Sequence, residues 1–149
     1  MAGRLSDPAL LEILPPPGRL TLDLACGSGE LARELRDRGH EVLAVESSRE
    51  LVRAARHADK RMEVLRADIA RMPMGSGIAD LAVCGAFDGL DDALVEIARV
   101  LKPGGRLCAA MTQPVALEEL SRGLERAGFV IEALRETPER LVMRARREP

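Results

Sequence analysis

Three acidic residues, Asp23, Glu46 and Asp68, lie in or directly after short apolar segments of the chain. A buried carboxylate without a partner is costly, so we expect Asp23 to face a ligand that carries an ammonium or sulfonium group. Glu46 offers two coplanar acceptor oxygens, which suit the two hydroxyl groups of a ribose. Asp68 is placed to accept a hydrogen bond from an exocyclic amine. A site built for pyrophosphate alone would not place a carboxylate at Asp23.

The residues around Asp23 predict a cradle for such a ligand. Residues 22–29 form an apolar run that leads into a glycine-containing turn. Gly27 and Gly29 lack a Cβ atom and let a ligand approach the main chain closely. A helix predicted from Glu30 onward directs its first amide N–H groups into the same space. Strand, turn and helix together predict a nucleotide-sized pocket.

Each of these residues also has a purely structural interpretation. Glu46 alone is typical of an acid near the start of the next helix, and Asp68 alone is typical of a loop cap. Gly27 and Gly29 alone are compatible with any tight turn. Their joint occurrence at the ends of predicted strands favours a binding site, because open α/β sheets bind ligands beyond the carboxyl ends of their strands.

Apolar runs alternate with helical periodicity along most of the chain. The pattern predicts strands at 20–24, 41–46, 62–67, 78–84 and 106–110, and helices at 30–38, 47–57, 91–101 and 117–127. Two half-exposed strands follow near 130–134 and 141–143. The predicted fold class is α/β: a doubly wound, mostly parallel seven-stranded sheet with helices on both faces and a C-terminal antiparallel hairpin.

Capping signals and prolines predict where individual helices begin and end. Ser6 stands at the N-cap position of an N-terminal helix that ends at the proline-rich residues 15–18. Ser47 and Glu50 have the spacing of a capping box for the helix at 47–57. We expect residues 1–149 to form a single domain, in which 1–18 supply a helix and a proline-rich lead-in and no separate substrate domain is present.

Composition excludes several kinds of site. The 149 residues carry a net charge of −2, contain no Trp or Tyr and only two Phe, and so offer neither a basic field nor a base-stacking platform for nucleic acid. Cys26, Cys84 and Cys108 lie in or at the end of apolar runs, which favours small core residues over a disulfide framework or a metal site. With no apolar signal or membrane-spanning stretch, we expect a cytoplasmic protein with no membrane partner.

The motifs resemble those of one known family. Residues 22–29 are similar to the first motif, D-x-G/A-x-G-x-G, of class I S-adenosylmethionine-dependent methyltransferases. Glu46 and Asp68 match the acids that end the second and third strands of that family. Residues 98–105 resemble its R-x-L-K-P-G-G segment, and the resemblance extends over about residues 20–135. It implies a Rossmann-like methyltransferase fold with S-adenosylmethionine as cofactor, S-adenosylhomocysteine as product and no metal.

The resemblance also implies which residues contact the cofactor. Asp23 would lie near its methionine end, Glu46 would hold the ribose hydroxyls, and Ser47 would pack beside the adenine. Asp68 and Ile69 would contact the adenine edge. Ala25 replaces a glycine common in the family, which is acceptable if its φ is not positive. The complete set implied is Asp23, Ala25, Cys26, Gly27, Gly29, Glu46, Ser47, Asp68, Ile69, Cys84 and Gly85, the last two through backbone near the methionine ammonium.

The reaction implied is an in-line attack on the sulfonium methyl group, driven mainly by proximity and desolvation. The residues that would act as acid or base are not apparent. His40 and His57 are expected at the surface, away from the site. Asp88 is the one candidate, against the alternative that it caps the following helix. A D/N-P-P-Y motif is absent from residues 84–87, which counts against adenine, cytosine or glutamine amide as acceptors.

Two alternative functions remain open. A G-x-G-x-x-A pattern at 27–32 also fits an NAD-binding domain, although Asp23 and Asp68 have no role there. The chain could also be a non-catalytic S-adenosylmethionine-binding or scaffold subunit. The acceptor is unknown, with a small molecule favoured. One short N-terminal helix and only residues 111–114 ahead of the next helix predict an open pocket, which could admit a large acceptor or be closed by a homodimer or a partner subunit. The last strand carries Arg140, Arg144, Arg146 and Arg147, which are expected to be solvated, against the alternative that they bind an acidic partner.

Overall fold

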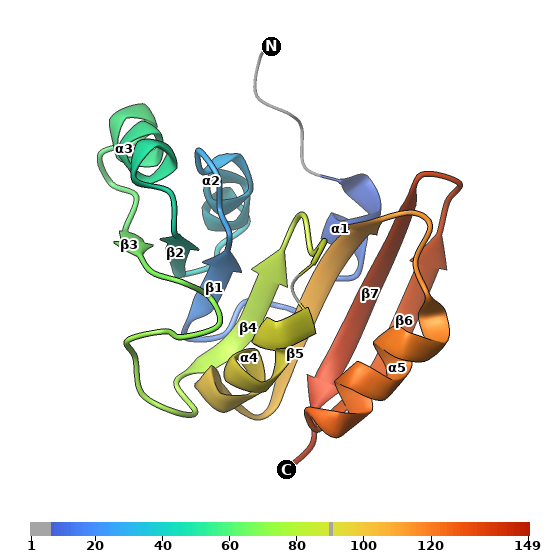
Figure 1. Ribbon diagram of the computed structural model, residues 1–149. Coiled ribbons are helices and arrows are strands. Elements are labelled where there is room, and N and C mark those ends of the chain that lie inside the picture. The colour runs from blue at the N-terminus through green and yellow to red at the C-terminus, as the bar shows by residue number, and fades with distance from the viewer. Residues whose placement is uncertain (1–6, 90) are drawn as a thin grey trace.

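A seven-stranded sheet in the order β3-β2-β1-β4-β5-β7-β6 forms the centre of the molecule (Figure 1). The structure is a computed structural model that describes residues 7–89 and 91–149. The strands are β1 Thr21–Leu24, β2 Val42–Glu46, β3 Val64–Arg66, β4 Ala79–Cys84, β5 Leu101–Thr112, β6 Phe129–Glu136 and β7 Arg140–Arg147. The helices are α1 Pro8–Glu12, α2 Glu30–Asp37, α3 Arg49–Ala58, the 3₁₀ turn η1 Asp91–Ala93, α4 Leu94–Val100 and α5 Leu117–Arg126.

Strand directions confirm the predicted fold class. Strands β3, β2, β1, β4 and β5 pair in parallel, whereas β7 pairs antiparallel with both β5 and β6. Strand β5 begins at Leu101 instead of the predicted residue 106. Leu101 pairs with Ala79 of β4, and the extra residues of β5 are accommodated by a register shift between Ala79 and Leu81. The carboxyl ends of the five parallel strands therefore lie along one edge of the sheet.

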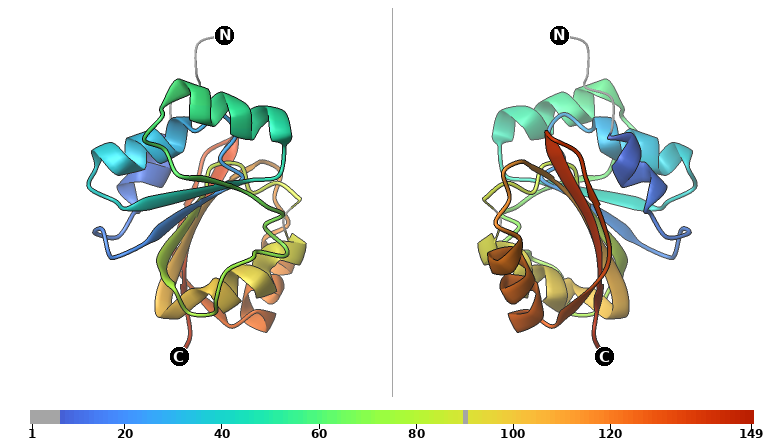
Figure 2. Two further views of the ribbon diagram at one scale, coloured as in Figure 1. Left: turned by 90° about the vertical axis from the view of Figure 1, so that its left-hand side faces the viewer. Right: turned by 90° about the vertical axis from the view of Figure 1, so that its right-hand side faces the viewer.

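Helices cover both faces of the sheet, as Figure 2 shows: α1, α2 and α3 lie on one side, and α4 and α5 on the other. On the first side, Leu10 and Leu35 pack in one cluster with Val83 of β4. On the second side, Ile97 and Leu124 belong to the largest cluster of buried side chains. None of the helices in the two described ranges is long and apolar enough to cross a bilayer.

Two predicted helix caps differ from the structure. The cap of α1 is Asp7, whose Oδ1 accepts a hydrogen bond from the Ala9 amide at 2.9 Å, and Ser6 lies outside the described residues. The cap of α3 is Ser48, not Ser47: its Oγ accepts from the Leu51 amide at 3.3 Å. Helix α3 therefore begins at Arg49 instead of the predicted residue 47, and the amide of its cap, Ser48, is bound by Glu46 at the end of β2.

The predicted surface position of His40 is wrong, although it does lie away from the candidate site, and His57 is exposed as expected. His40 is only 5% exposed, and its Nδ1 lies 2.9 Å from the Thr21 hydroxyl at the start of β1. Burial, together with nearby Arg38, lowers the pKa of His40. A hydrogen-bonded, neutral imidazole can therefore be buried in the core at the amino end of the sheet, opposite the predicted site.

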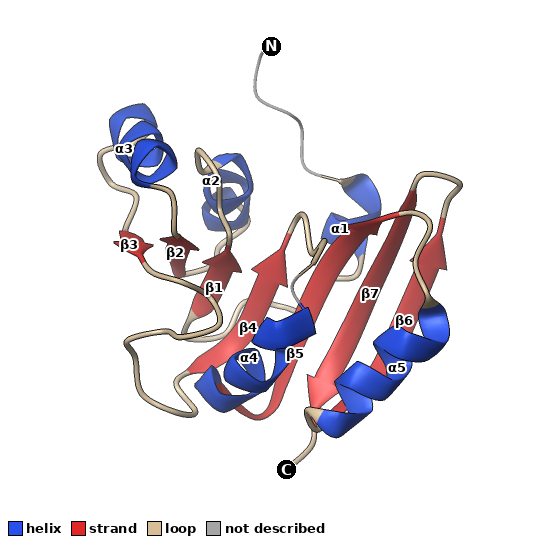
Figure 3. Cartoon of the chain, in the orientation of Figure 1, coloured by secondary structure: helices blue, strands red, loops and turns tan. Residues whose placement is uncertain are grey.

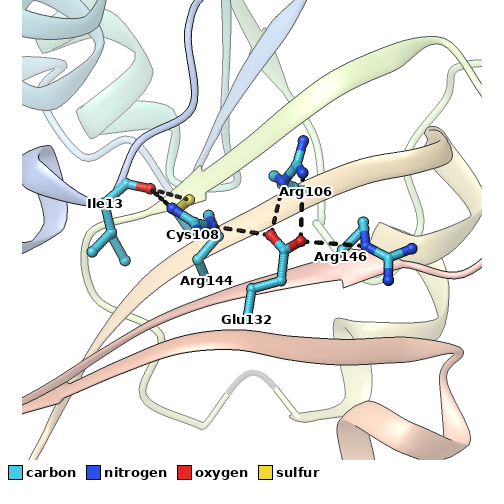
Figure 4. Close-up of polar contacts among 6 residues, drawn as sticks. All are labelled: Ile13, Arg106, Cys108, Glu132, Arg144 and Arg146. Atoms are coloured by element: carbon cyan, nitrogen blue, oxygen red, sulfur yellow. Dashed lines mark hydrogen bonds and ion pairs between the residues drawn. The ribbon is translucent and has the colours of Figure 1, made fainter.

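The arginines of β7 are also less solvated than predicted. Arg106, Arg144 and Arg146 converge on the Glu132 carboxylate, with Nε to oxygen distances of 2.8, 3.1 and 3.3 Å (Figure 4). Arg144 additionally donates to the Ile13 carbonyl at 2.9 Å. This network connects the antiparallel end of the sheet to the residues that follow α1, and it holds the pKa of Glu132 below its usual value, mainly through Arg106.

Ala25, directly after β1, has φ at 55°, in the left-handed region that non-glycine residues rarely adopt. The condition under which its replacement of glycine is free of strain is therefore not met. A left-handed conformation costs an L-residue roughly 1–2 kcal/mol. Glycine would avoid this cost, but it loses more chain entropy on folding, and that loss offsets part of the gain.

We expect Ala25→Gly to raise the free energy of unfolding by about 0.5–1 kcal/mol. Urea denaturation with linear extrapolation measures this change. Ala86→Gly is the matched control, because Ala86 is also exposed in a loop but does not have a positive φ. An equal or larger rise in the control would show that strain at Ala25 is not the cause.

Candidate functional site

The turn after β1 and the end of β2 form one hydrogen-bonded unit at the carboxyl edge of the sheet, where the loops follow the parallel strands (Figure 3). The Glu46 side chain is 7% exposed and bridges two backbone groups. Its Oε1 accepts from the Gly27 amide and its Oε2 from the Ser48 amide, both at 2.9 Å. Both oxygens keep acceptor capacity for ribose hydroxyls, so the structure is compatible with the predicted role of Glu46.

Asp23 lies beneath this unit and is 1% exposed. Its Oδ2 is buried and has no hydrogen-bond partner within the described residues. Burial raises the pKa of Asp23 to about 8, with additional contributions from the negative charges of Glu30 and Glu46, and the Ala32 amide opposes the rise. Such an orphaned acceptor needs a donor or a cation from outside the chain.

The two glycines of the turn have different roles. Gly27 has φ at 59°, and a Cβ atom placed on it would meet no atom within 4 Å, so this position opens onto free space. Gly29 has φ at 93°, and its Cβ would approach Arg33 Nη1 at 3.3 Å and Ala55 Cβ at 3.4 Å. Gly27 thus suits close approach of a ligand, whereas Gly29 allows α2 to pack against α3.

The residues predicted to contact adenine follow two neighbouring parallel strands: Ser47 comes directly after β2, and Asp68 and Ile69 come shortly after β3. Ser47 and Asp68 are exposed, whereas Ile69 is 8% exposed and belongs to the core. The Asp68 Oδ1 accepts from the Ala70 amide at 2.9 Å, so its side chain does cap the loop, as the structural interpretation proposed. Its second oxygen remains available to a ligand. The adenine role of these residues stays a prediction.

The end of β4 reveals a contact that the sequence did not indicate. Arg140 Nη2 donates to the Gly85 carbonyl at 2.8 Å, and Arg140 Nε lies 3.5 Å from Asp7 Oδ2. The same guanidinium therefore contacts a predicted backbone group of the site and the cap of α1. The one sequence signal for this contact was an arginine at the start of the last strand. Residue spacing does not indicate how that strand pairs with β5, so it could not predict the contact with Gly85.

All three cysteines are buried with free thiols, as predicted for small core residues. Burial raises the pKa of each of them, Cys26, Cys84 and Cys108, to about 12. At neutral pH these thiols are protonated, and they are unsuited to nucleophilic chemistry. Cys26 and Cys84 accordingly contribute backbone and packing, but not a thiolate, to the candidate site.

Asp88, the candidate acid or base, is exposed and engaged at the end of β5. Its Oδ1 accepts from the Thr112 amide at 2.8 Å and its Oδ2 from the Thr112 hydroxyl at 3.1 Å. It does not cap the following helix, whose N-cap is Ala93. Asp88 thus joins the loop after β4 to the end of β5, and a catalytic role for it remains a prediction.

A hollow of about 580 Å³ lies beyond β5, on the same edge of the sheet. It lies between the residues that follow β5 and the turn between β6 and β7, and is lined by Gln113, Pro114, Glu136, Thr137 and Pro138. A second hollow, of about 340 Å³, lies between η1, α4 and α5. Neither hollow includes Asp23, so the chemistry of the orphaned carboxylate, not hollow size, locates the candidate site.

Asp23 should make stability depend on pH. The pKa of Asp23 is about 8 in the folded chain against 3.8 for an ordinary aspartate, so the folded state keeps a proton that the unfolded state loses. The free energy of unfolding should therefore fall, by a few kcal/mol at most, as pH rises from about 4 to about 8. Asp23→Asn should remove most of this slope in urea denaturation, whereas Asp37→Asn should leave it intact. Equal slopes in wild type and Asp23→Asn would contradict the prediction.

Comparisons with known proteins agree with this geometry. Residues 22–109 match the model of a methyltransferase domain. The chain is 31% identical over 128 residues to a malonyl-(acyl-carrier protein) O-methyltransferase of Pectobacterium atrosepticum, a match covering 83% of this chain and 51% of that protein. It is 36% identical over 110 residues to an uncharacterized methyltransferase of Mycobacterium tuberculosis, covering 70% and 45%. The chain spans about half the length of these curated relatives.

Solved structures show the same fold. An S-adenosylmethionine-dependent methyltransferase from Mesorhizobium loti superposes with a TM-score of 0.84 at 20% identity, covering 94% of this chain and 96% of that one. A methyltransferase from Haloferax volcanii, solved in complex with the Trm112 activator, superposes with a TM-score of 0.79 at 18% identity, covering 95% and 87%. With its family match, its sheet order and its buried strand-end carboxylates, the chain belongs to the class I S-adenosylmethionine-dependent methyltransferases.

Proposed function

We propose that the chain binds S-adenosylmethionine at the turn after β1 and transfers its methyl group to an acceptor that approaches along the carboxyl edge of the sheet. One observation supports this most directly: within the described residues the buried Asp23 Oδ2 has no hydrogen-bond partner, and its strand β1 leads into a turn that opens at Gly27. A ligand ammonium group is the donor that this carboxylate lacks. The family match supports S-adenosylmethionine as that ligand.

The residues present fit that ligand. Asp23 would bind its ammonium group as a carboxylate, since a nearby cation favours the charged form. Glu46 would orient the ribose while keeping its bonds to the Gly27 and Ser48 amides. Asp68 and Ile69 would contact the adenine. When bound, S-adenosylmethionine supplies a methyl group on a positively charged sulfur.

The protein's part in the transfer would be mainly alignment and exclusion of water. Asp88 already accepts two hydrogen bonds from Thr112, so its carboxylate is better placed to join β4 to β5 than to remove a proton. An acceptor that is already ionised would need no base. The site thus favours such an acceptor.

The relatives suggest which acceptor that could be. Those from Pectobacterium atrosepticum and Enterobacter lignolyticus, at 31% and 34% identity, are named malonyl-(acyl-carrier protein) O-methyltransferases. A malonyl group ends in a carboxylate, which is ionised at neutral pH. We therefore extend the proposal to O-methylation of a carboxylate, with the hollow beyond β5 as its approach. A partner subunit that covers the open edge remains part of the proposal.

Calorimetry tests the cofactor site. Wild type should bind S-adenosylmethionine and S-adenosylhomocysteine but not NAD. Asp23→Ala should weaken both by more than about tenfold, because an ammonium group would lose its buried partner. Glu46→Ala should weaken them as well, and Asp37→Ala, on the exposed end of α2, should not. Binding of NAD alone would reject the proposal, and unchanged affinity in Glu46→Ala would reject the ribose assignment.

Transfer of a radiolabelled methyl group tests the acceptor. We expect label on malonyl-(acyl-carrier protein) or on a small malonyl thioester, and none on the corresponding acetyl compounds, which lack the carboxylate. Label on acetyl compounds would reject a carboxylate acceptor. Cofactor binding without any transfer, in cell extract as well as with these acceptors, would favour a non-catalytic or scaffold subunit.

A further inference from the structure

The segment from residue 67 to 78, between β3 and β4, contains no helix or strand, apart from a bridge between Asp68 and Arg71. It nevertheless covers part of the core, because Ile69 and Met72 are 8% and 4% exposed. An irregular segment cannot satisfy its own backbone groups as a helix does. Something else must therefore hold it in place.

Two residues of α4 hold this segment. Arg99 Nη2 donates to the Met72 carbonyl at 3.0 Å, and its Nη1 donates to the Met74 carbonyl at 2.9 Å and to Ser76 Oγ at 3.2 Å. Glu96 Oε2 accepts from the Met72 amide at 2.6 Å. Both backbone polar groups of Met72 are thus bound by the side chains of one helix.

Glu96 and Arg99 also bind each other. Arg99 Nε donates to Glu96 Oε1 at 2.6 Å and Arg99 Nη2 to Glu96 Oε2 at 2.9 Å. This two-point contact fixes the plane of the guanidinium, which a lysine cannot reproduce. Hydrogen bonding from Arg99 keeps the pKa of Glu96 low, so the pair stays ionised at neutral pH.

The end of the segment is attached to the same helix. The Gly77 amide donates to the Arg99 carbonyl at 2.8 Å, and the Ile78 amide to the Val100 carbonyl at 2.9 Å. The start of the segment is attached to β2, since the Ala67 amide donates to the Glu46 carbonyl at 3.1 Å. Between these two attachments, Glu96 and Arg99 fix the path of the chain, and Asp68 and Ile69 lie only a few residues before Met72.

We propose that Glu96 and Arg99 are positioning residues for the base of the cofactor: they fix the segment that presents Asp68 and Ile69 and thereby set the preference for adenine. This proposal rests on the proposed function, because it needs adenine at Asp68. A shift of the segment by one residue would displace Asp68 by about 3.3–3.6 Å, more than a hydrogen bond tolerates. Neither residue would touch the ligand.

The test compares two ligands that differ only at the base, S-adenosylhomocysteine and S-inosylhomocysteine, in which a carbonyl replaces the exocyclic amine. Wild type should bind the adenine compound more tightly by about tenfold or more, as expected for a hydrogen bond to a carboxylate. In Arg99→Lys this ratio should fall several-fold. Arg122→Lys is the matched control, since Arg122 pairs with Glu118 at 3.3 Å and both side chains are exposed on the surface of α5.

Hydrogen exchange supplies a readout that needs no ligand. In Arg99→Lys, the amides of residues 69–72 and 74–76 should exchange at least about tenfold faster, while those of β1 and β4 stay protected. If Arg99→Lys fails to fold, Ser76→Ala, which removes one of the contacts, should show the same changes to a smaller degree. Unchanged exchange in 69–76 would overturn the proposal whatever the ligand is.

Two further outcomes separate this proposal from the proposed function. Faster exchange with an unchanged ligand ratio would reduce Glu96 and Arg99 to a structural role and overturn the proposal. A wild type that binds both ligands equally would contradict the adenine assignment of Asp68, and this proposal with it, while leaving the Asp23 experiment unaffected. Asp68→Asn should lower the ratio as strongly as Arg99→Lys, without faster exchange in residues 72–76.

Discussion

The buried carboxylate of Glu46 is the interaction on which the rest of the site depends. It accepts one hydrogen bond from the Gly27 amide, in the turn after β1, and another from the Ser48 amide, at the start of α3. These two bonds fix the loops on both sides of the candidate cofactor site. The same negative charge helps to raise the pKa of Asp23. Burial is the main cause of that rise, and Glu46 adds to it, so the residue that shapes the turn also contributes to the protonation of Asp23.

Much of the fold could be predicted from sequence because its strands are continuous apolar runs, as buried parallel strands require. The positions of Asp23 and Glu46 followed from that pattern, since both belong to strands that end at the same edge. Other features depend on three-dimensional partners. The burial of His40 requires the Thr21 hydroxyl, and the contact of Asp88 with Thr112 requires β5 to end beside the loop after β4. No local pattern records such pairings.

Backbone conformation set a second limit on prediction. Ala25 is an ordinary residue by composition, and its positive φ follows only from how the turn is held. Likewise, the start of β5 depends on a register shift against β4. The last strand looked solvated because it is rich in arginine, but Glu132 and the carbonyl of Ile13 draw those side chains onto the chain itself. Sequence indicates charge, whereas tertiary contacts decide whether that charge remains in solvent.

Arg140 has a consequence of a mechanical kind. Its guanidinium contacts two separate segments: Nη2 donates to the Gly85 carbonyl, and Nε lies near the carboxylate of Asp7, the N-cap of α1. The side chain of Arg140 thereby links the amino-terminal helix to the loop after β4, two segments that lie about half the chain apart in sequence. A displacement of α1 would therefore remove one of the two contacts that hold this guanidinium beside Gly85.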